Sequence, residues 1–129
     1  MRYLLDTHTF IWWDQKSANL SPRARALFHD TAARLLLSIA SVWEIQIKLA
    51  IGKLALPAPL VSIVNNQIKT NQIELLPITL SHIAGLDGLP MHHRDPFDRM
   101  LIAQAITEQI PIISADPVMD QYPVTVIWK

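Results

Sequence analysis

Residues 34–52, RLLLSIASVWEIQIKLAIG, carry the clearest structural pattern in the chain. The run Leu35–Leu37 is apolar without alternation, which is typical of a strand buried on both faces. Ser41-Val-Trp-Glu44 matches a capping box at a helix start, and Gly52 is a residue type that commonly follows a helix end. The stretch therefore predicts a buried strand followed by a helix, the repeating unit of α/β proteins.

The same alternation of short apolar runs and helical segments extends over the whole chain. Ser21-Pro22 and Asp95-Pro96 are strong helix starts, each with a capping residue followed by proline at the first helical position. We predict strands over 3–5, 34–37, 73–76, 111–114 and 124–127. We predict helices over 9–13, 22–30, 41–51, 60–70, 79–86 and 96–109. This order predicts one α/β domain over residues 1–129, with a parallel sheet covered by helices on both faces.

Composition excludes several classes of protein. Half of the residues are hydrophobic and 17% are charged, which is not the composition of a disordered chain. The absence of cysteine excludes disulfide scaffolds, thiolate zinc sites and cysteine nucleophiles. No apolar run approaches the roughly 18 residues that a membrane span needs. Asp6 lies where a signal peptide would need its apolar core, which argues against secretion. We therefore expect a cytoplasmic protein without a membrane partner. The net charge of +0 argues against binding nucleic acid through bulk charge.

Four acidic residues are predicted to lie on one edge of the sheet. In a parallel sheet, the carboxyl ends of strands and the starts of the following helices share the edge where ligands bind. Asp6 and Asp116 follow the first and fourth predicted strands, while Glu44 and Asp98 lie near helix starts. No Lys or Arg is obviously placed to neutralise them, since neighbouring residues on a helix point apart.

Carboxylates held close together repel one another unless they are protonated or bind a cation. Oxygen ligands suit Mg²⁺ or Mn²⁺, and such ions activate water and hold a phosphodiester in many nucleases. Glu44, Asp98 and Asp116 also have separate structural explanations, as part of a capping box, a dipole partner and a turn residue, and Asp95 is explained best as a helix cap. Asp6 is harder to explain in this way, because it directly follows a buried strand and has no evident partner. One shared metal site is the more economical hypothesis, and it also answers the objection from net charge.

Four motifs in order resemble the PIN-domain family, and more narrowly the VapC-type toxins of bacterial toxin–antitoxin pairs. The resemblance covers the chain from residue 1 to Trp128. The string His93-Arg-Asp-Pro-Phe-Asp-Arg99 is typical of one branch of the family. The motifs are Leu5-Asp6-Thr7-His8, Ser41-Val42-Trp43-Glu44-Ile45, Asp95-Pro96-Phe97-Asp98-Arg99 with Leu101-Ile102-Ala103-Gln104-Ala105, and Ser114-Ala115-Asp116.

The resemblance implies a three-layer α/β/α fold with a five-stranded parallel sheet in the order 3-2-1-4-5. It implies a Mg²⁺- or Mn²⁺-dependent endoribonuclease acting on cellular RNA, with Asp6, Glu44, Asp98 and Asp116 as catalytic metal ligands. Thr7, Ser114 and Asp95 are expected in supporting roles. The family also implies a homodimer that a cognate antitoxin silences, with DNA bound only through that antitoxin.

Some residues are weaker candidates for contact with RNA. His93, Arg94 and Arg99 are candidate substrate-binding residues, because positive charge must follow the RNA backbone. The roles of His8, His92 and the tryptophans stay open. For Trp43 we favour packing in the core, because it lies between apolar residues of a predicted helix.

Other functions remain open on the sequence alone. A phosphatase of the haloacid dehalogenase type would use Asp6 as nucleophile, but it requires a second acid two residues later, where this chain has His8. A receiver-like signalling domain requires an Asp at the end of the third strand, where this chain has Leu76-Pro77. A PIN-like binding module without catalysis is the third alternative, and only an assay excludes it.

Overall fold

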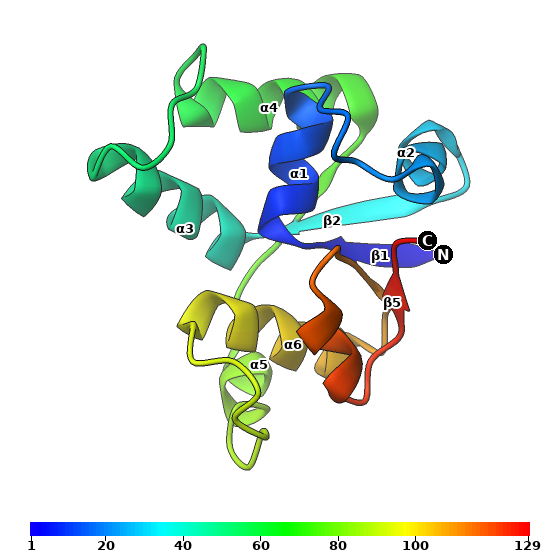
Figure 1. The fold of residues 1–129 in the computed structure, drawn as a ribbon, viewed down its shortest axis with the longest axis vertical. Helices are drawn as coiled ribbons and strands as arrows, with labels where there is room; N and C mark the ends of the chain where they lie inside the picture. The colour runs from blue at the N-terminus through cyan, green and yellow to red at the C-terminus, as the bar shows by residue number, and fades with distance from the viewer.

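The computed structural model describes residues 1–129 as a parallel sheet between two layers of helices (Figure 1). In chain order the elements are β1 (Arg2–Leu5), α1 (Thr7–Asp14), α2 (Pro22–His29), β2 (Arg34–Ser38), α3 (Ile39–Ala50), α4 (Leu60–Asn71), β3 (Glu74–Leu76), α5 (Leu80–Ala84), α6 (Pro96–Glu108), β4 (Ile112–Ile113), the 3₁₀ helix η1 (Pro117–Gln121) and β5 (Val126–Ile127). No helix is long and apolar enough to cross a membrane.

The five strands are all parallel and follow the order β3-β2-β1-β4-β5, which confirms the predicted topology. β1 is central, with Leu5 beside Leu37 of β2 on one side and beside Ile113 of β4 on the other. The carboxyl ends of β1 and β4 are therefore neighbours, and the residues that follow these strands meet at one edge.

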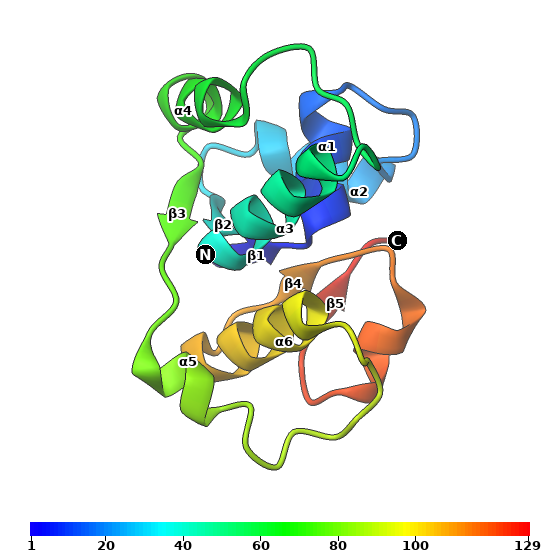
Figure 2. The same cartoon turned by 90° about the vertical axis from the view of Figure 1, so that its left-hand side faces the viewer.

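Side chains of the central strands alternate between two buried clusters, as the apolar runs predicted. Leu5, Leu37 and Ile113 belong to the cluster beneath helices α1 to α4. Leu4 and Ile112 belong to the cluster beneath α6 and η1. Figure 2 shows the two helical layers, with α1, α3 and α4 on one side of the sheet and α5 and α6 on the other.

The start of α3 differs from the predicted capping box. The helix begins at Ile39, directly after β2, and the hydroxyl of Ser38 caps it by accepting from Ala40 N at 3.0 Å. Ser41 lies inside the helix, and Glu44 lies in its second turn. The capping-box prediction was wrong because Ser38 also has a capping side chain, and it stands immediately at the end of the strand.

Two further helix boundaries differ from the predictions by two residues. α1 begins at Thr7 and is capped by Asp6, where we predicted a helix from residue 9. α5 ends at Ala84, before the predicted residue 86. Its start holds the capping box that the sequence analysis missed, between Thr79 and His82, because His is not the Glu or Gln that marks this motif.

Candidate active site

Asp6 lies at the centre of the predicted edge, between the end of β1 and the start of α1. Its carboxylate accepts from the backbone N–H of Thr7 at 2.7 Å and from the Ser114 hydroxyl at 2.7 Å. The side chain is buried, and this burial raises the pKa of Asp6 against the effect of these hydrogen bonds. Asp6 is therefore held in one orientation while its negative charge is only partly compensated.

Glu44 reaches the same edge from the second turn of α3. Its Oε1 accepts from the Thr7 hydroxyl at 2.8 Å, and that hydroxyl also lies 2.8 Å from Ser41 Oγ. Its Oε2 accepts from Lys48 Nζ at 2.7 Å. The expectation that no Lys or Arg faces the four acids was wrong for Glu44. The i,i+4 spacing of Glu44 and Lys48 on one helix was the sequence signal for this pair.

Asp98 lies in the first turn of α6, which Asp95 caps as predicted by accepting from Phe97 N at 2.7 Å. Asp98 is partly buried, and burial together with the charges of Asp95, Asp6 and Glu44 raises its pKa to about 7. His93 opposes this shift without cancelling it. Asp98 is therefore close enough to be affected by the charges of three other acids, which come from three separate parts of the chain.

Asp116 follows β4 and caps η1, its Oδ1 accepting from Val118 N at 2.9 Å. Its Oδ2 lies 2.7 Å from Nε2 of His93, which comes from the loop between α5 and α6. One ligand atom from each of His93, Asp98 and Asp116 lies within 4.8 Å of the others. His93 was predicted to contact RNA, and its contact with Asp116 was not predicted, because no local pattern links residues 23 positions apart.

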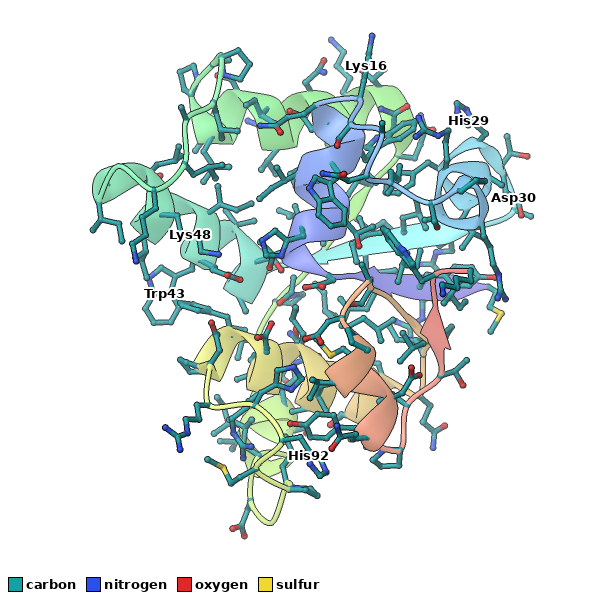
Figure 3. The ribbon with its side chains drawn as sticks, viewed as in Figure 1. Lys16, His29, Asp30, Trp43, Lys48 and His92 are labelled. Carbon is teal, nitrogen blue, oxygen red and sulfur yellow. The ribbon has the colours of Figure 1, made fainter.

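The weaker candidates take different positions. Arg94 is exposed, whereas Arg99 donates to the carbonyls of Pro90 and Leu89 and so braces the loop that carries His93. Trp43 is 60% exposed, so the prediction of core packing was wrong; its ring meets Phe97 edge to face at 5.2 Å. Figure 3 shows Trp43 and Lys48 along α3, with His92 far from both, in the loop before α6.

The donor set fits a hard divalent cation. All four acids offer carboxylate oxygens, the ligand type that Mg²⁺ and Mn²⁺ prefer, and an imidazole nitrogen is close by. Only Glu44 has a Lys or Arg partner. Burial and the neighbouring acids both raise the pKa of Asp98, and a bound cation would stabilise its ionised form. The arrangement can therefore hold a metal ion and, through it, a phosphate group.

Comparisons with known proteins agree with this fold. The family model for the PIN domain matches residues 3–124. Among curated proteins, none matches the chain. Several solved structures share the fold at low sequence identity, as the following three show.

The structure of VapBC2 from Rickettsia felis bound to a promoter DNA fragment matches with a TM-score of 0.73 and 13% identity, over 100% of both chains. DNA-bound VapBC from Salmonella typhimurium matches with a TM-score of 0.69 and 17% identity, over 98% of this chain and 97% of that one. FitAcB from Neisseria gonorrhoeae matches with a TM-score of 0.64 and 17% identity, over 97% and 96%.

Proposed function

Because the chain belongs to the PIN-domain family, we propose that it is a Mg²⁺- or Mn²⁺-dependent endoribonuclease, the toxin of a toxin–antitoxin pair. The observation that carries the proposal is the group of acids at this edge of the sheet. Burial and the charges of Asp95, Asp6 and Glu44 raise the pKa of Asp98 to about 7, and a carboxylate oxygen of Asp98 lies within 4.8 Å of one of Asp116. Such a concentration of negative charge is costly unless it serves to bind a cation.

In this proposal, Asp6, Glu44, Asp98 and Asp116 hold the metal. The ion would supply activation of water and neutralisation of charge on the scissile phosphate. Asp6 is oriented by Thr7 N and the Ser114 hydroxyl, so its position does not depend on the substrate. The Thr7 hydroxyl orients Glu44, and Asp95 orients the first turn of α6 that carries Asp98. Residues of the chain thus fix the ligands before RNA arrives.

Positive charge near the site is sparse, so the metal is expected to provide much of the attraction for RNA. Arg94 is the remaining candidate for a phosphate contact, because it is exposed beside the loop that carries His93. Arg99 is engaged with backbone carbonyls, so we assign it the role of bracing this loop.

An antitoxin is the proposed partner protein. The similar structures are of VapBC and FitAB assemblies, and three of them are described as bound to DNA. By analogy, the antitoxin would silence the nuclease and connect it to DNA, while the toxin itself acts on cytoplasmic RNA.

A homodimer is also proposed, and one helix offers a surface for it. Ile39, Trp43, Ile47 and Ile51 follow one another at i,i+4 spacing along α3, and all four are exposed. A stripe of exposed apolar residues at this spacing is typical of a surface that a partner covers. Loss of the dimer in Trp43→Ser, measured by light scattering after size exclusion, would support α3 as the contact.

The decisive assay is cleavage of cellular RNA by the purified protein, with Mg²⁺ or Mn²⁺ and with EDTA. We expect cleavage with either ion, none with EDTA, and none by Asp98→Asn in any condition. Lys53→Ala, a substitution on the exposed surface, is the matched control and should retain activity. If a correctly folded wild-type protein binds RNA and leaves it intact with both ions, the alternative of a PIN-like binding module without catalysis is correct.

A further inference from the structure

His93 and Tyr122 form a hydrogen-bonded pair that ends on Asp116. The Tyr122 hydroxyl accepts from the backbone N–H of His93 at 2.9 Å and lies 3.0 Å from His93 Nδ1. On the other side of the ring, His93 Nε2 lies 2.7 Å from Asp116 Oδ2. The rings of His93 and Tyr122 stack nearly in parallel, with their centroids 5.5 Å apart.

The contact with Asp116 decides which ring nitrogen carries the hydrogen. Because a carboxylate only accepts hydrogen bonds, His93 Nε2 carries a hydrogen and donates it to Asp116 Oδ2. In the neutral imidazole Nδ1 then accepts, and its donor is the Tyr122 hydroxyl. A ring nitrogen that carries this hydrogen is a donor and not a metal ligand.

Both ends of this chain of contacts belong to one short element. Asp116 is the N-cap of η1, and Tyr122 is its C-cap. His93 comes from a different loop and bridges the two ends. Tyr122 and the side chain of His93 are largely buried, whereas the side chain of Asp116 remains 30% exposed. Val118 N holds Oδ1 of Asp116, and the buried pair holds the other carboxylate oxygen, Oδ2.

We propose that His93, held by Tyr122, is a positioning residue that orients the carboxylate of Asp116 for the metal. The inference rests on the proposed function, because it presumes that Asp116 is a ligand. This role explains why a histidine stands at the start of the string from His93 to Arg99, which the family match and the four acids alone do not explain. Donors that orient a ligating group commonly contribute a tenfold to hundredfold difference in metal affinity.

The test is a titration of the purified protein with Mn²⁺. Electron paramagnetic resonance measures the concentration of free Mn²⁺ at each step and so gives the binding affinity. His93→Met and His93→Gln are a matched pair of similar length, of which only Gln keeps an N–H donor near the position of Nε2. We expect a tenfold to hundredfold weaker affinity in His93→Met and a loss well under tenfold in His93→Gln. Tyr122→Phe should fall between them, because it removes one hydroxyl and leaves the ring.

His92→Gln is the control from the same loop. His92 meets Tyr122 edge to face at 4.9 Å and contacts none of the acids, so this variant should bind Mn²⁺ as the wild type does. Circular dichroism shows whether each variant is folded. If His93→Met fails to fold, the comparison of wild type, His93→Gln and Tyr122→Phe still measures the contribution of the donor chain.

The outcomes separate this inference from the proposed function. Wild-type protein without affinity for Mn²⁺ would overturn both. Affinity that is equal in the wild type, His93→Met and Tyr122→Phe would overturn only the positioning role. A nitrogen coupling typical of direct coordination in the pulsed spectrum of the bound Mn²⁺ would also overturn it, because His93 would then be a ligand itself.

Discussion

The two halves of the site hold their acids in different ways. Asp6 and Glu44, next to the α1–α3 layer, are buried and joined through Thr7, with Ser114 and Ser41 supplying further hydroxyl groups. Asp98 and Asp116, next to α6 and η1, are more exposed, and they lie close to each other and to His93. Hydrogen bonds, mainly from neutral donors, hold the acids of the first half, whereas in the second half Asp98 is affected by burial and by the charges of other acids.

This difference indicates a division of labour. Hydroxyl and backbone donors, with Lys48 on Glu44, hold Asp6 and Glu44 in place without a metal ion, so that half is organised by the fold alone. At Asp98 burial, together with the charges of Asp95, Asp6 and Glu44, raises the pKa to about 7, so that half gains most when a metal ion binds. We expect substitutions that remove a hydroxyl donor from the first half to lower stability, and substitutions in the second half to change the response to protons and metal.

The greatest change is expected from Asp6→Asn. This variant keeps the size of the side chain and removes a buried charge, so the free energy of unfolding should be retained. Loss of a charge that stabilises a reaction commonly lowers the rate by about a hundredfold to a thousandfold, and we expect at least this loss of RNA cleavage. Cleavage at the wild-type rate by Asp6→Asn, purified free of wild-type enzyme, would contradict the assignment.

Ser114→Ala should destabilise the protein by about 1–3 kcal/mol, because a buried hydroxyl that donates to Asp6 and accepts from Asp116 N is removed. Urea denaturation measures this change. Ser81→Ala, on the exposed surface of α5, is the matched control and should leave the transition unchanged. An equal effect of the two substitutions would mean that hydroxyl groups do not hold the first half together.

A smaller effect is expected from pH on the metal-free protein. The pKa of Asp98 is about 7 in the folded state and near 3.8 in the unfolded chain, so folding favours its protonated form. Stability should therefore rise as the pH falls from 8 to 5, and Asp98→Asn should flatten this slope. The range stops at pH 5 because Glu74 and Glu108 have lowered pKa values and lose their stabilising contribution in more acidic solution. A slope that is unchanged in Asp98→Asn would show that other groups cause it.

The least change is expected from Lys48→Met. The ion pair with Glu44 spans one helical turn and is partly exposed, and such pairs contribute about 0.3–0.5 kcal/mol. The free energy of unfolding of Lys48→Met, measured by thermal denaturation, should be lower than that of the wild type by no more than this amount. A loss of several kcal/mol would mean that Lys48, and not Thr7, is the principal support of Glu44.

The sequence predicted the sheet and the edge that carries the acids, because continuous apolar strands and capped helix starts are local patterns. Ser21, Asp95 and Gly52 behave as predicted for the same reason. Local patterns failed where two residues compete for one role, as Ser38 and Ser41 do at the start of α3.

Contacts between segments that are distant in the sequence could not be predicted from local patterns. Ser114 binds Asp6 across 108 residues, and no spacing rule links His93 to Tyr122 or Asp116. The exposure of Trp43 was missed because apolar neighbours in the chain do not reveal which face of α3 another element covers. These details depend on how β1, β4 and the loops assemble, which the order of elements alone does not specify.

Anomalous diffraction from crystals soaked in Mn²⁺, measured at the manganese absorption edge, tests most directly whether the four acids bind a metal ion. We predict an anomalous peak among the four acids, at bonding distance from a carboxylate oxygen of Asp6 and from at least one of Asp98 and Asp116. A protein that cleaves RNA in Mn²⁺ but shows no peak there, or binds the ion elsewhere, would contradict the metal-dependent mechanism proposed for this site.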